Sequence, residues 1–405
     1  MSTNNKKNAD KKKNSYISGK ESRNISAFNK KLTKKLEKRR AANNVNPDTY
    51  ITEMKDSNNI LEFDNVCTFF FTDIGTVKAV DGISFEIPKN STVGVVGESG
   101  CGKSVTSLSV MQLLQRPVGQ VVGGEIRFNF DNGKAYNIVN VPNSEMMKIR
   151  GNKISMIFQE PMTSLNPVFR IGMQVDEVIN LHTPGLSKEE VKAKTIDMLK
   201  QVGIANAEGV YNMFPHELSG GMRQRVMIAM ALVCNPELII ADEPTTALDV
   251  TIQAQILDLL QELKDKINSS IMLITHDLGV IAHMADYVVV MYAGRIVEKG
   301  TKEDIFHNPI HPYTIGLMKS KPAINKKVDS LYNIRGNVPN PVNMPNHCYF
   351  KDRCDYCTAK CDEKYPPVIK VSDTHYVSCY RCFEEGEVVG YPKTVDPEVL
   401  LNELK

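Results

Sequence analysis

Apolar residues fall into short runs and periodic stripes along most of the chain beyond residue 60. Segments 60–71 and 78–87 are rich in β-branched and aromatic residues and are separated by turn residues, so the pattern predicts two strands there. Four uninterrupted apolar runs predict buried strands of the kind found in parallel sheets: 92–96, 238–240, 271–274 and 287–291.

Stripes with a helical period lie between these runs. After Ser104 the apolar positions follow a helical period as far as Pro117, and residues 252–267 carry the apolar stripe of an amphipathic helix. The pattern of residues 161–235 is also mostly helical. Strands that alternate with helices predict an α/β layer fold with a mostly parallel sheet. Because no internal repeat is visible, we expect one copy of this unit and an accessory domain in the 405 residues.

The composition, with 42% apolar and 24% charged residues, is typical of a soluble globular protein. No run approaches the roughly 18 consecutive apolar residues of a membrane-spanning helix. The charged N-terminus lacks the apolar segment of a secretory signal. We therefore expect any association with a membrane to pass through a partner.

The net charge of +2 conceals a strongly basic N-terminus. Residues 1–47 contain fourteen Lys or Arg and three Asp or Glu. Such a segment buries too little apolar surface to offset its ordering entropy, so we expect residues 1–58 to form a basic disordered tail. A basic helix over residues 25–45 on an anionic surface is the alternative, although a solvated tail is favoured.

A glycine-rich segment follows the run at 92–96. Gly97-Glu-Ser-Gly-Cys-Gly102-Lys103-Ser104 fits G-x-x-x-x-G-K-[ST], a pattern that arranges backbone N–H groups and a helix N-terminus around phosphate oxygens. We expect Lys103 to reach the β- and γ-phosphates of ATP and Ser104 to bind Mg²⁺. The predicted nucleotide-binding residues of this loop are Gly97, Glu98, Ser99, Gly100, Cys101, Gly102, Lys103, Ser104 and Val105.

A pair of carboxylates ends the apolar run at 238–240. The segment Leu238-Ile-Ile-Ala-Asp242-Glu243-Pro244 has the Walker B form, in which a buried strand delivers acids at its C-terminal end. Asp242 is expected to hold Mg²⁺, directly or through water. Glu243 points differently and is expected to polarise the attacking water.

Residues 218–225 resemble the signature of ABC ATPases. Leu218-Ser219-Gly220-Gly221-Met222 carries Met222 where the family usually has Gln. This departure removes a polar side chain but leaves Ser219 and the backbone donors of a helix start. The resemblance implies that Ser219, Gly220 and Gly221 complete the ATP site of an opposing subunit.

Further motifs follow the order of the same family. Gln159 matches the Q-loop, which contacts Mg²⁺ and senses the transmembrane partner, and Asp249 in Ala247-Leu-Asp249 matches the D-loop. His276 matches the switch histidine near the γ-phosphate, so the resemblance implies catalytic roles for Glu243, His276 and Gln159. The candidates for the aromatic that stacks on adenine are Phe70, which is preferred, and Phe69 or Phe71.

Several longer sequence motifs resemble those of the oligopeptide and dipeptide importer ATPases. The resemblance covers about residues 60–385. It comprises Gln159-Glu-Pro-Met-Thr-Ser-Leu-Asn-Pro167, Phe214-Pro-His-Glu217, residues 241–255 and His311-Pro-Tyr-Thr314. The phosphate loop and signature look like those of the D-type subunit. The resemblance implies an ATPase that powers peptide import, with a nickel or glutathione importer of the same family as the alternative.

The resemblance also implies an assembly. Such proteins pair with a paralogous F-type ATPase subunit under two transmembrane permease subunits, at the cytoplasmic face of the membrane. An extracytoplasmic peptide-binding protein feeds the permeases, and no nucleic acid is expected as a partner.

The implied fold is a P-loop NTPase core of the ABC type, over residues 59–325, with a helical subdomain at about 161–235. A small Cys-rich extension is expected at 326–385, after a Pro-rich linker at about 335–345, and a tail at 386–405.

Six of the nine cysteines lie between residues 348 and 382. The family resemblance implies that Cys348, Cys354, Cys361 and Cys379 hold a 4Fe–4S cluster, as in some members. A second interpretation pairs Cys354-x-x-Cys357 with Cys379-x-x-Cys382 around zinc, at a spacing just outside the usual one. A third is a set of reduced thiols in a packed extension.

Two functions of other classes compete with transport. Soluble ABC ATPases of translation or DNA repair usually carry two ATPase domains or a long coiled coil, and neither is visible in the sequence. A nucleic-acid-binding metal module with a basic arm is disfavoured, because the arm lacks interleaved aromatics and the Cys-rich segment lacks a basic recognition helix.

Overall fold

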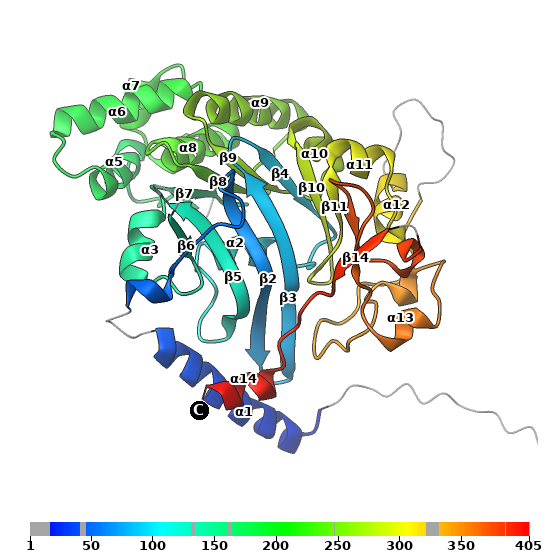
Figure 1. Cartoon of the computed structure of the whole chain (residues 1–405). Helices are drawn as coiled ribbons and strands as arrows, with labels where there is room; N and C mark the ends of the chain where they lie inside the picture. Colours follow the sequence, from blue (N-terminus) through cyan, green and yellow to red (C-terminus); the bar gives the residue numbers. More distant parts are fainter. Residues whose placement is uncertain are drawn as a thin grey trace, which may run out of the picture.

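The computed structural model describes residues 17–40, 46–130, 134–160, 164–246, 248–320, 332–384 and 386–404. Two sheets lie at its centre, with helices around them and a C-terminal extension at one side (Figure 1). No helix in the described parts of the chain is both long and apolar enough to cross a membrane.

The larger sheet has nine strands in the order β14-β12-β13-β11-β10-β4-β9-β8-β7. Five neighbouring strands run parallel. The apolar runs predicted four of them: β10 (Tyr287–Tyr292), β4 (Thr92–Val96), β9 (Ser270–Ile274) and β8 (Leu238–Asp242). The fifth, β7 (Ile154–Ile157), was not predicted. Four antiparallel strands extend the sheet on one side: β11 (Arg295–Thr301), β13 (Tyr376–Val377), β12 (Val368–Lys370) and β14 (Glu387–Gly390). The predicted parallel sheet is therefore confirmed for its core, and the C-terminal extension continues the same sheet.

The second sheet is wholly antiparallel and was not predicted as a separate layer. Its order is β1 (Ile51–Thr52), β6 (Lys134–Asn137), β5 (Gly119–Phe130), β2 (Asn59–Thr72) and β3 (Gly75–Pro88). The two strands predicted at 60–71 and 78–87 are confirmed as β2 and β3. Phe63 and Phe85 stack across them with ring centroids 4.2 Å apart. This sheet packs its apolar face against β4, β8 and β9 in one buried cluster.

Helices surround both sheets and gather in one arm. Between β7 and β8 the chain forms α5 (Ile171–His182), α6 (Lys188–Gln201), α7 (Ala207–Tyr211) and α8 (Gly220–Leu232), which confirms the predicted helical region (Figure 1). The predicted amphipathic helix is confirmed as α9 (Val250–Ile267). The remaining helices of the core are α2 (Lys103–Val110), α3 (Asn143–Ile149), α10 (Leu278–Met284), α11 (Lys302–His307) and α12 (Pro312–Lys319).

Helix α2 is shorter than its apolar pattern predicted. The pattern continues to Pro117, whereas the helix ends at Val110. Gln112 adopts a left-handed conformation with φ of 51°, which an α-helix does not accommodate. Its side chain donates to the carbonyl of Val141 at 3.1 Å, so a tertiary contact holds the chain out of the helix here.

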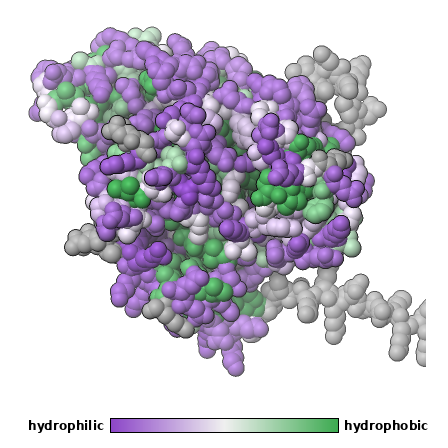
Figure 2. Space-filling model, in the orientation of Figure 1, coloured by the Kyte–Doolittle hydropathy of each residue, from purple (hydrophilic) through white to green (hydrophobic). Residues whose placement is uncertain are grey.

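The prediction of a disordered N-terminal tail is wrong for most of its described part. Helix α1 (Gly19–Arg40) packs Leu32, which is fully buried, together with Phe69 and Phe71 of β2. The C-terminal residues expected to be a tail form β14 and α14 (Pro397–Glu403), and Leu400 and Leu401 join the same cluster. In Figure 1 the two helices lie side by side, and in Figure 2 hydrophobic residues reach the surface where β2 and β3 meet α14. Phe28, Leu32 and Leu36 form an apolar stripe whose partners lie far along the chain, so composition alone concealed it.

The start of ordered structure also comes earlier than predicted. A 3₁₀ turn, η1 (Pro47–Thr49), and strand β1 precede residue 59. The predicted disorder of residues 1–16 and 41–45 lies outside the described residues.

The segment predicted as a linker is packed instead. Ile334 and Met344 are buried, and Val342 forms a β-bridge with Val77 of β3. Beyond it the extension contains η3 (Lys351–Arg353), α13 (Lys360–Glu363) and η4 (Tyr380–Cys382). Apolar contacts across the segment therefore join the extension to the core.

Candidate functional site

The glycine-rich loop connects the end of β4 to the start of α2. The loop backbone passes so close to other backbone segments of the same protein that two of its positions admit only glycine. A Cβ on Gly97 would lie 2.2 Å from the carbonyl oxygen of Met291, and one on Gly102 would lie 2.3 Å from that of Ala79. Gly102 also has φ of 101°. The predicted strand, loop and helix are therefore all present, and the loop wraps the N-terminus of α2.

The side chain of Lys103 folds back across this loop. Its Nζ donates to the carbonyls of Gly97 at 2.8 Å and Glu98 at 3.1 Å, and the residue is only 6% exposed. Cys101 is buried beside it, and burial raises the pKa of its thiol. Ser99 and Gly100 remain at the surface, as does Ser104. The positive charge thus lies within the loop, where bound phosphates would need it.

Two of the three side chains predicted to bind magnesium, those of Ser104 and Asp242, lie in contact. Ser104 Oγ donates to Asp242 Oδ1 at 3.0 Å, and Ser107 Oγ donates to Asp242 Oδ2 at 3.3 Å. Asp242 ends β8 and is 5% exposed, and this burial raises the pKa of its carboxyl group. Ser107 was missed by the sequence analysis, although it lies three residues after Ser104 on the same helix.

The three residues given catalytic roles also converge. Gln159 Nε2 donates to Glu243 Oε2 at 3.0 Å, and His276 Nδ1 lies 3.2 Å from Glu243 Oε1. They follow β7, β8 and β9, whose carboxyl ends adjoin in the parallel sheet. Thr246 Oγ1, which the sequence analysis missed, also donates to Glu243 Oε2 at 2.9 Å.

The backbone of Glu243 has an unusual conformation. Its φ of 48° is left-handed, and its N–H donates to the carbonyl of Ile274 in β9 at 2.8 Å. Such a conformation is costly for a residue with a side chain and is retained where surrounding structure enforces it. It turns the Glu243 carboxylate toward Gln159 and His276, while Asp242 remains beside the phosphate loop.

The signature and D-loop residues lie at helix starts on the surface. Ser219 Oγ accepts a hydrogen bond from the N–H of Met222 at 3.3 Å, and Asp249 Oδ1 accepts one from Ile252 at 2.9 Å. Both residues are exposed, and so is Gly220, whereas Gly221 packs against Ile252. Ala247 of the D-loop lies outside the described residues.

The signature helix is connected to the carboxylate pair. Gln224 of α8 is 1% exposed, and its Nε2 donates to the carbonyl of Pro244 at 2.6 Å. A shift of the signature helix would therefore act on the backbone beside Glu243.

Among the three candidate aromatics, only Phe70 keeps part of its ring accessible. Phe69 is fully buried and Phe71 is 5% exposed, both in the cluster with α1. Phe70 points to the other face of β2, against Gly119 of β5. Its role in holding adenine stays a prediction.

Four cysteines line one cavity in the extension. This cavity of about 300 Å³ is lined by Cys348, Cys354, Cys361 and Cys379 together with aromatic residues. Burial raises the pKa of Cys348 to about 12 and that of Cys379 to about 11. The cavity brings together the four positions that the resemblance named.

The arrangement predicted for zinc is not assembled. Cys357 is exposed and Cys382 is buried in a separate cluster with Ile369 and Val377, and neither lines the cavity. In the described parts of the chain, no three His, Cys, Asp or Glu side chains are grouped so that they could hold a metal ion.

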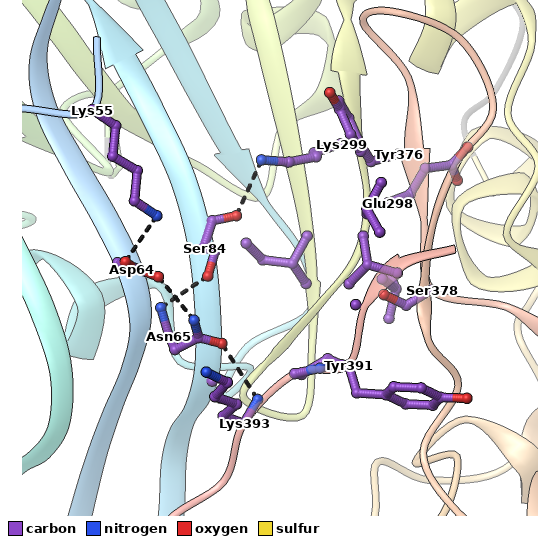
Figure 3. A pocket seen from close by; sticks show the side chains of 17 residues that line it. Lys55, Asp64, Asn65, Ser84, Glu298, Lys299, Tyr376, Ser378, Tyr391 and Lys393 are labelled. Carbon is purple, nitrogen blue, oxygen red and sulfur yellow. Dashed lines mark hydrogen bonds and ion pairs between the residues drawn. The ribbon is translucent and has the colours of Figure 1, made fainter. Parts of the chain in front are cut away.

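A second cavity, of about 400 Å³, lies between the β2–β3 hairpin and the strands of the extension (Figure 3). Lys55 pairs with Asp64 at 2.8 Å at its edge, and Lys299 pairs with Glu86 at 3.1 Å. No residue of the predicted ATP site lines this cavity.

Comparison with known proteins gives matches along most of the chain. The family model described as ABC transporter matches residues 80–246, and that described as oligopeptide/dipeptide transporter, C-terminal region, matches residues 297–361. The chain is 49% identical to the oligopeptide transport ATP-binding protein AppD of Bacillus subtilis (strain 168), over 81% of this chain and 98% of AppD. It is 48% identical to the dipeptide transport ATP-binding protein DppD of Lactococcus lactis subsp. cremoris, over 79% of this chain and 90% of DppD.

Solved structures share the fold of the core. The dimeric ATP-binding cassette MJ0796, bound to ADP and Pi, has a TM-score of 0.52 and 27% identity, and the match covers 60% of this chain and 98% of that one. For cbiO1 of Clostridium perfringens, part of the transporter complex cbiONQ, the TM-score is also 0.52 at 27% identity, over 62% and 92% of the two chains.

Proposed function

Because this chain belongs to the oligopeptide/dipeptide transport ATP-binding proteins of the ABC transporter family, we infer that it hydrolyses ATP to power peptide import, and we propose which residues and partners serve that activity. The observation that carries the assignment of the site is the meeting of the phosphate loop with the ends of three parallel strands. Ser104 contacts Asp242 there, and Glu243 contacts Gln159 and His276.

The phosphate loop and Lys103 bind the triphosphate. Backbone N–H groups of the loop and the N-terminus of α2 supply donors, and the Lys103 ammonium supplies charge. Phe70 stacks on adenine from near the C-terminal end of β2.

Ser104 and Asp242 fit magnesium, since a hydroxyl and a carboxylate 3.0 Å apart are oxygen donors that this ion prefers. Gln159, which contacts Glu243, is the third predicted ligand. When bound, Mg²⁺ neutralises charge on the β- and γ-phosphate oxygens.

Glu243 prepares the attacking water. Its carboxylate accepts hydrogen bonds from Gln159 and Thr246, which orient it, and a carboxylate held in this way can accept a proton from water. His276 is 66% exposed in its side chain, so it can reach the γ-phosphate when a second subunit closes over the site.

The exposed signature serves an opposing subunit. Ser219, Gly220 and Asp249 lie on the surface at helix starts, where they can contact a nucleotide held by another chain. We assign the F-type paralogue as that chain. ATP held between the two subunits adds charge-assisted contacts that favour closure, and hydrolysis removes them.

Two permease subunits receive this movement at the cytoplasmic face of the membrane, against Gln159 and the helical arm that follows it. A peptide-binding protein on the outer side supplies the cargo. The match of residues 297–361 to the oligopeptide/dipeptide transporter C-terminal region favours peptides over nickel or glutathione.

The cysteine cavity is proposed to hold a 4Fe–4S cluster. Four thiols around a single cavity of about 300 Å³ suit a group that takes one thiolate on each iron. Iron and acid-labile sulfide, measured on anaerobically purified protein, should be stoichiometric in the wild type and in Cys357→Ser, and lost in Cys361→Ser. Zinc without iron, or thiols without metal, would reject the cluster.

The transport function is tested by purifying the tagged chain from detergent-solubilised membranes. Permease subunits and a paralogous ATPase should be retained, and the complex should release phosphate from Mg·ATP. Ribosomes or nucleic acid in their place would support the soluble ATPases of translation or repair. A complex that neither binds Mg·ATP nor releases phosphate would refute the assignment.

A further inference from the structure

Glu98, the second residue of the phosphate loop, is held by one residue of α12 and one residue of the C-terminal extension. Its backbone N–H donates to the hydroxyl oxygen of Tyr313 at 2.8 Å. Its carboxylate accepts two hydrogen bonds from Arg353, Nη1 to Oε2 at 2.6 Å and Nη2 to Oε1 at 3.0 Å. Tyr313 and Arg353 both lie in the part of the chain matched by the oligopeptide/dipeptide transporter C-terminal model.

The side chain of Arg353 is held in place by contacts other than those with Glu98. Its side chain is 6% exposed, and its Nε donates to the carbonyl of Arg335 at 3.0 Å. The guanidinium also lies over the rings of Tyr292 and Phe350, within 5.7 and 5.9 Å of their centroids. The planar guanidinium is thus held on several sides, and both of its terminal nitrogens donate hydrogen bonds to the Glu98 carboxylate. Such a pair of hydrogen bonds sets the position and the orientation of the carboxylate.

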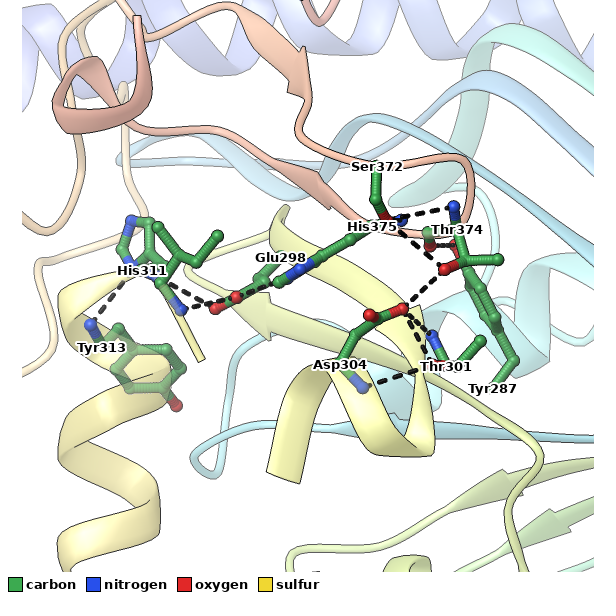
Figure 4. Close-up of polar contacts among 10 residues, drawn as sticks. Tyr287, Glu298, Thr301, Asp304, His311, Tyr313, Ser372, Thr374 and His375 are labelled. Carbon is green, nitrogen blue, oxygen red and sulfur yellow. Dashed lines mark hydrogen bonds and ion pairs between the residues drawn. The ribbon is translucent and has the colours of Figure 1, made fainter. Parts of the chain in front are cut away.

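Tyr313 is fixed through a buried acid. Glu298, fully buried in β11, accepts hydrogen bonds from the N–H groups of Ile310 and His311 at 2.8 and 3.0 Å, and its Oε1 lies 2.8 Å from His375 Nε2 (Figure 4). His311 Nδ1 then accepts the N–H of Tyr313 at 3.0 Å and caps α12. The start of α12, and with it Tyr313, is thereby tied to the larger sheet.

The loop itself needs such support. It contains three glycines with positive φ and so loses much backbone freedom when it becomes ordered. Lys103 Nζ contacts the Glu98 carbonyl at 3.1 Å, so the clamped residue also contacts the lysine expected at the phosphates. A loop ordered before ATP arrives binds ATP more tightly, because the ordering cost has already been met.

We propose that Arg353 and Tyr313 are positioning residues for ATP, which hold the phosphate loop of the same chain in its binding conformation. The inference rests on the proposed ATP site at that loop. It gives the C-terminal extension a part in nucleotide affinity in addition to its contacts with the core.

The test is a comparison of KM for ATP with kcat in the assembled complex. Arg353→Met and Glu98→Gln should each raise KM about five- to twentyfold and change kcat less than about twofold, since they disorder the loop without touching Glu243. The double variant should add little to either single one, because both remove the same contact. Arg353→Lys should recover part of the affinity, and Tyr313→Phe should raise KM by a smaller factor.

The matched control is Lys370→Met, which removes the ion pair with Asp373 at 2.9 Å on the surface of the extension. It should leave KM unchanged. A purely structural contact would lower the chemical denaturation midpoint in Arg353→Met and leave KM of the folded complex unaltered, and that result would overturn the proposal. Should Arg353→Met fail to fold, Arg353→Gln, which removes the charge and the paired hydrogen bonds but stays polar, decides, and a KM within about twofold of wild type there would be equally decisive. Absence of ATPase activity in the wild type and in Lys370→Met would instead contradict the proposed function.

Discussion

Gln159 donates a hydrogen bond of 3.0 Å to the carboxylate of Glu243, across the ends of two neighbouring parallel strands. Glu243 adopts a left-handed conformation with φ of 48°, so its side chain turns away from Asp242, the adjacent residue. The two adjacent acidic residues therefore occupy different positions in the site: Asp242 lies beside the phosphate loop and Glu243 lies beside Gln159.

Glu243→Gln should bind Mg·ATP with nearly normal affinity and hydrolyse it about 100- to 10,000-fold more slowly, because an amide cannot accept a proton from water. Nucleotide binding and phosphate release in the assembled complex measure the two quantities. Glu237→Gln, which alters an acid at the opposite end of β8, should retain full activity. Normal transport-linked ATPase activity in Glu243→Gln would contradict the role assigned to this carboxylate.

Lys103→Ala should weaken ATP binding about 10- to 100-fold, because it removes a charge-assisted hydrogen-bond donor from the centre of the loop. Equilibrium titration with a fluorescent ATP analogue measures the Kd. Lys89→Ala removes an exposed lysine from the turn before β4 and serves as the control. Equal Kd values for the two variants would exclude a direct contact between Lys103 and the phosphates.

Ser219→Ala should lower ATPase activity of the assembled complex by roughly tenfold, because in the proposed assembly the exposed signature serine contacts nucleotide held by the other subunit. Ser187→Ala removes the N-cap serine of α6, whose hydroxyl accepts a hydrogen bond from the backbone N–H of Glu190 as that of Ser219 does from Met222. That variant should lose about 1 kcal/mol of stability and keep its ATPase activity. If both variants behaved alike, Ser219 would be an N-cap and nothing more.

His311 should make the chain less stable in mild acid. Burial is the main cause that lowers the pKa of His311 to about 4; the Glu298 carboxylate raises this pKa, and the Arg381 guanidinium lowers it further. The folded state thus disfavours the proton that the unfolded chain accepts below about pH 6.5, so stability falls as the pH decreases from that value toward 4. Between pH 7.5 and 5 the loss should be on the order of 2 kcal/mol by urea denaturation.

His311→Asn retains an acceptor for the N-cap of α12 and removes the titrating group. It should abolish most of this pH dependence, whereas His216→Asn, an exposed histidine of η2, should not. A wild-type stability that stays constant over the same pH range would contradict the prediction.

Leu32→Ala should destabilise the chain by about 2–5 kcal/mol, because it leaves a cavity between α1, β2 and α14. Thermal or urea unfolding measures the difference. Lys34→Ala, on the exposed side of the same helix, should change stability by less than about 0.5 kcal/mol. Identical midpoints for the two variants would indicate that α1 does not pack against the sheet in solution.

The strands that carry the ATP site could be predicted because each is encoded locally. The strands that contain the runs at 92–96 and 238–240 are buried at every position, their residues are almost all apolar, and their motifs follow at once in sequence. His276 likewise follows a predicted run, whereas Gln159 was identified only by its resemblance to the Q-loop; the parallel strands bring both residues to the same edge of the sheet.

Contacts between distant segments left no such local signal. The Arg353–Glu98 pair joins residues 255 positions apart, and neither residue is unusual in its own surroundings. Helix α1 was misjudged because its many lysines dominate the composition, whereas the stripe of Phe28, Leu32 and Leu36 acquires meaning only beside β2 and α14. The strands of the extension are two to four residues long, too short for a periodic pattern to reveal them.

The contact between α1 and α14 has a consequence for the order of synthesis. The ribosome synthesises the chain at about 5–20 residues per second, so the residues of α1 emerge first and Leu400 and Leu401 emerge only at the end. For most of that interval the apolar stripe of α1 lacks its final covering, which makes the nascent chain a substrate for chaperones at its very first helix. Premature termination just short of α14 would leave the same stripe covered by the antiparallel sheet but not by α14, so proteolysis would be expected to remove such products.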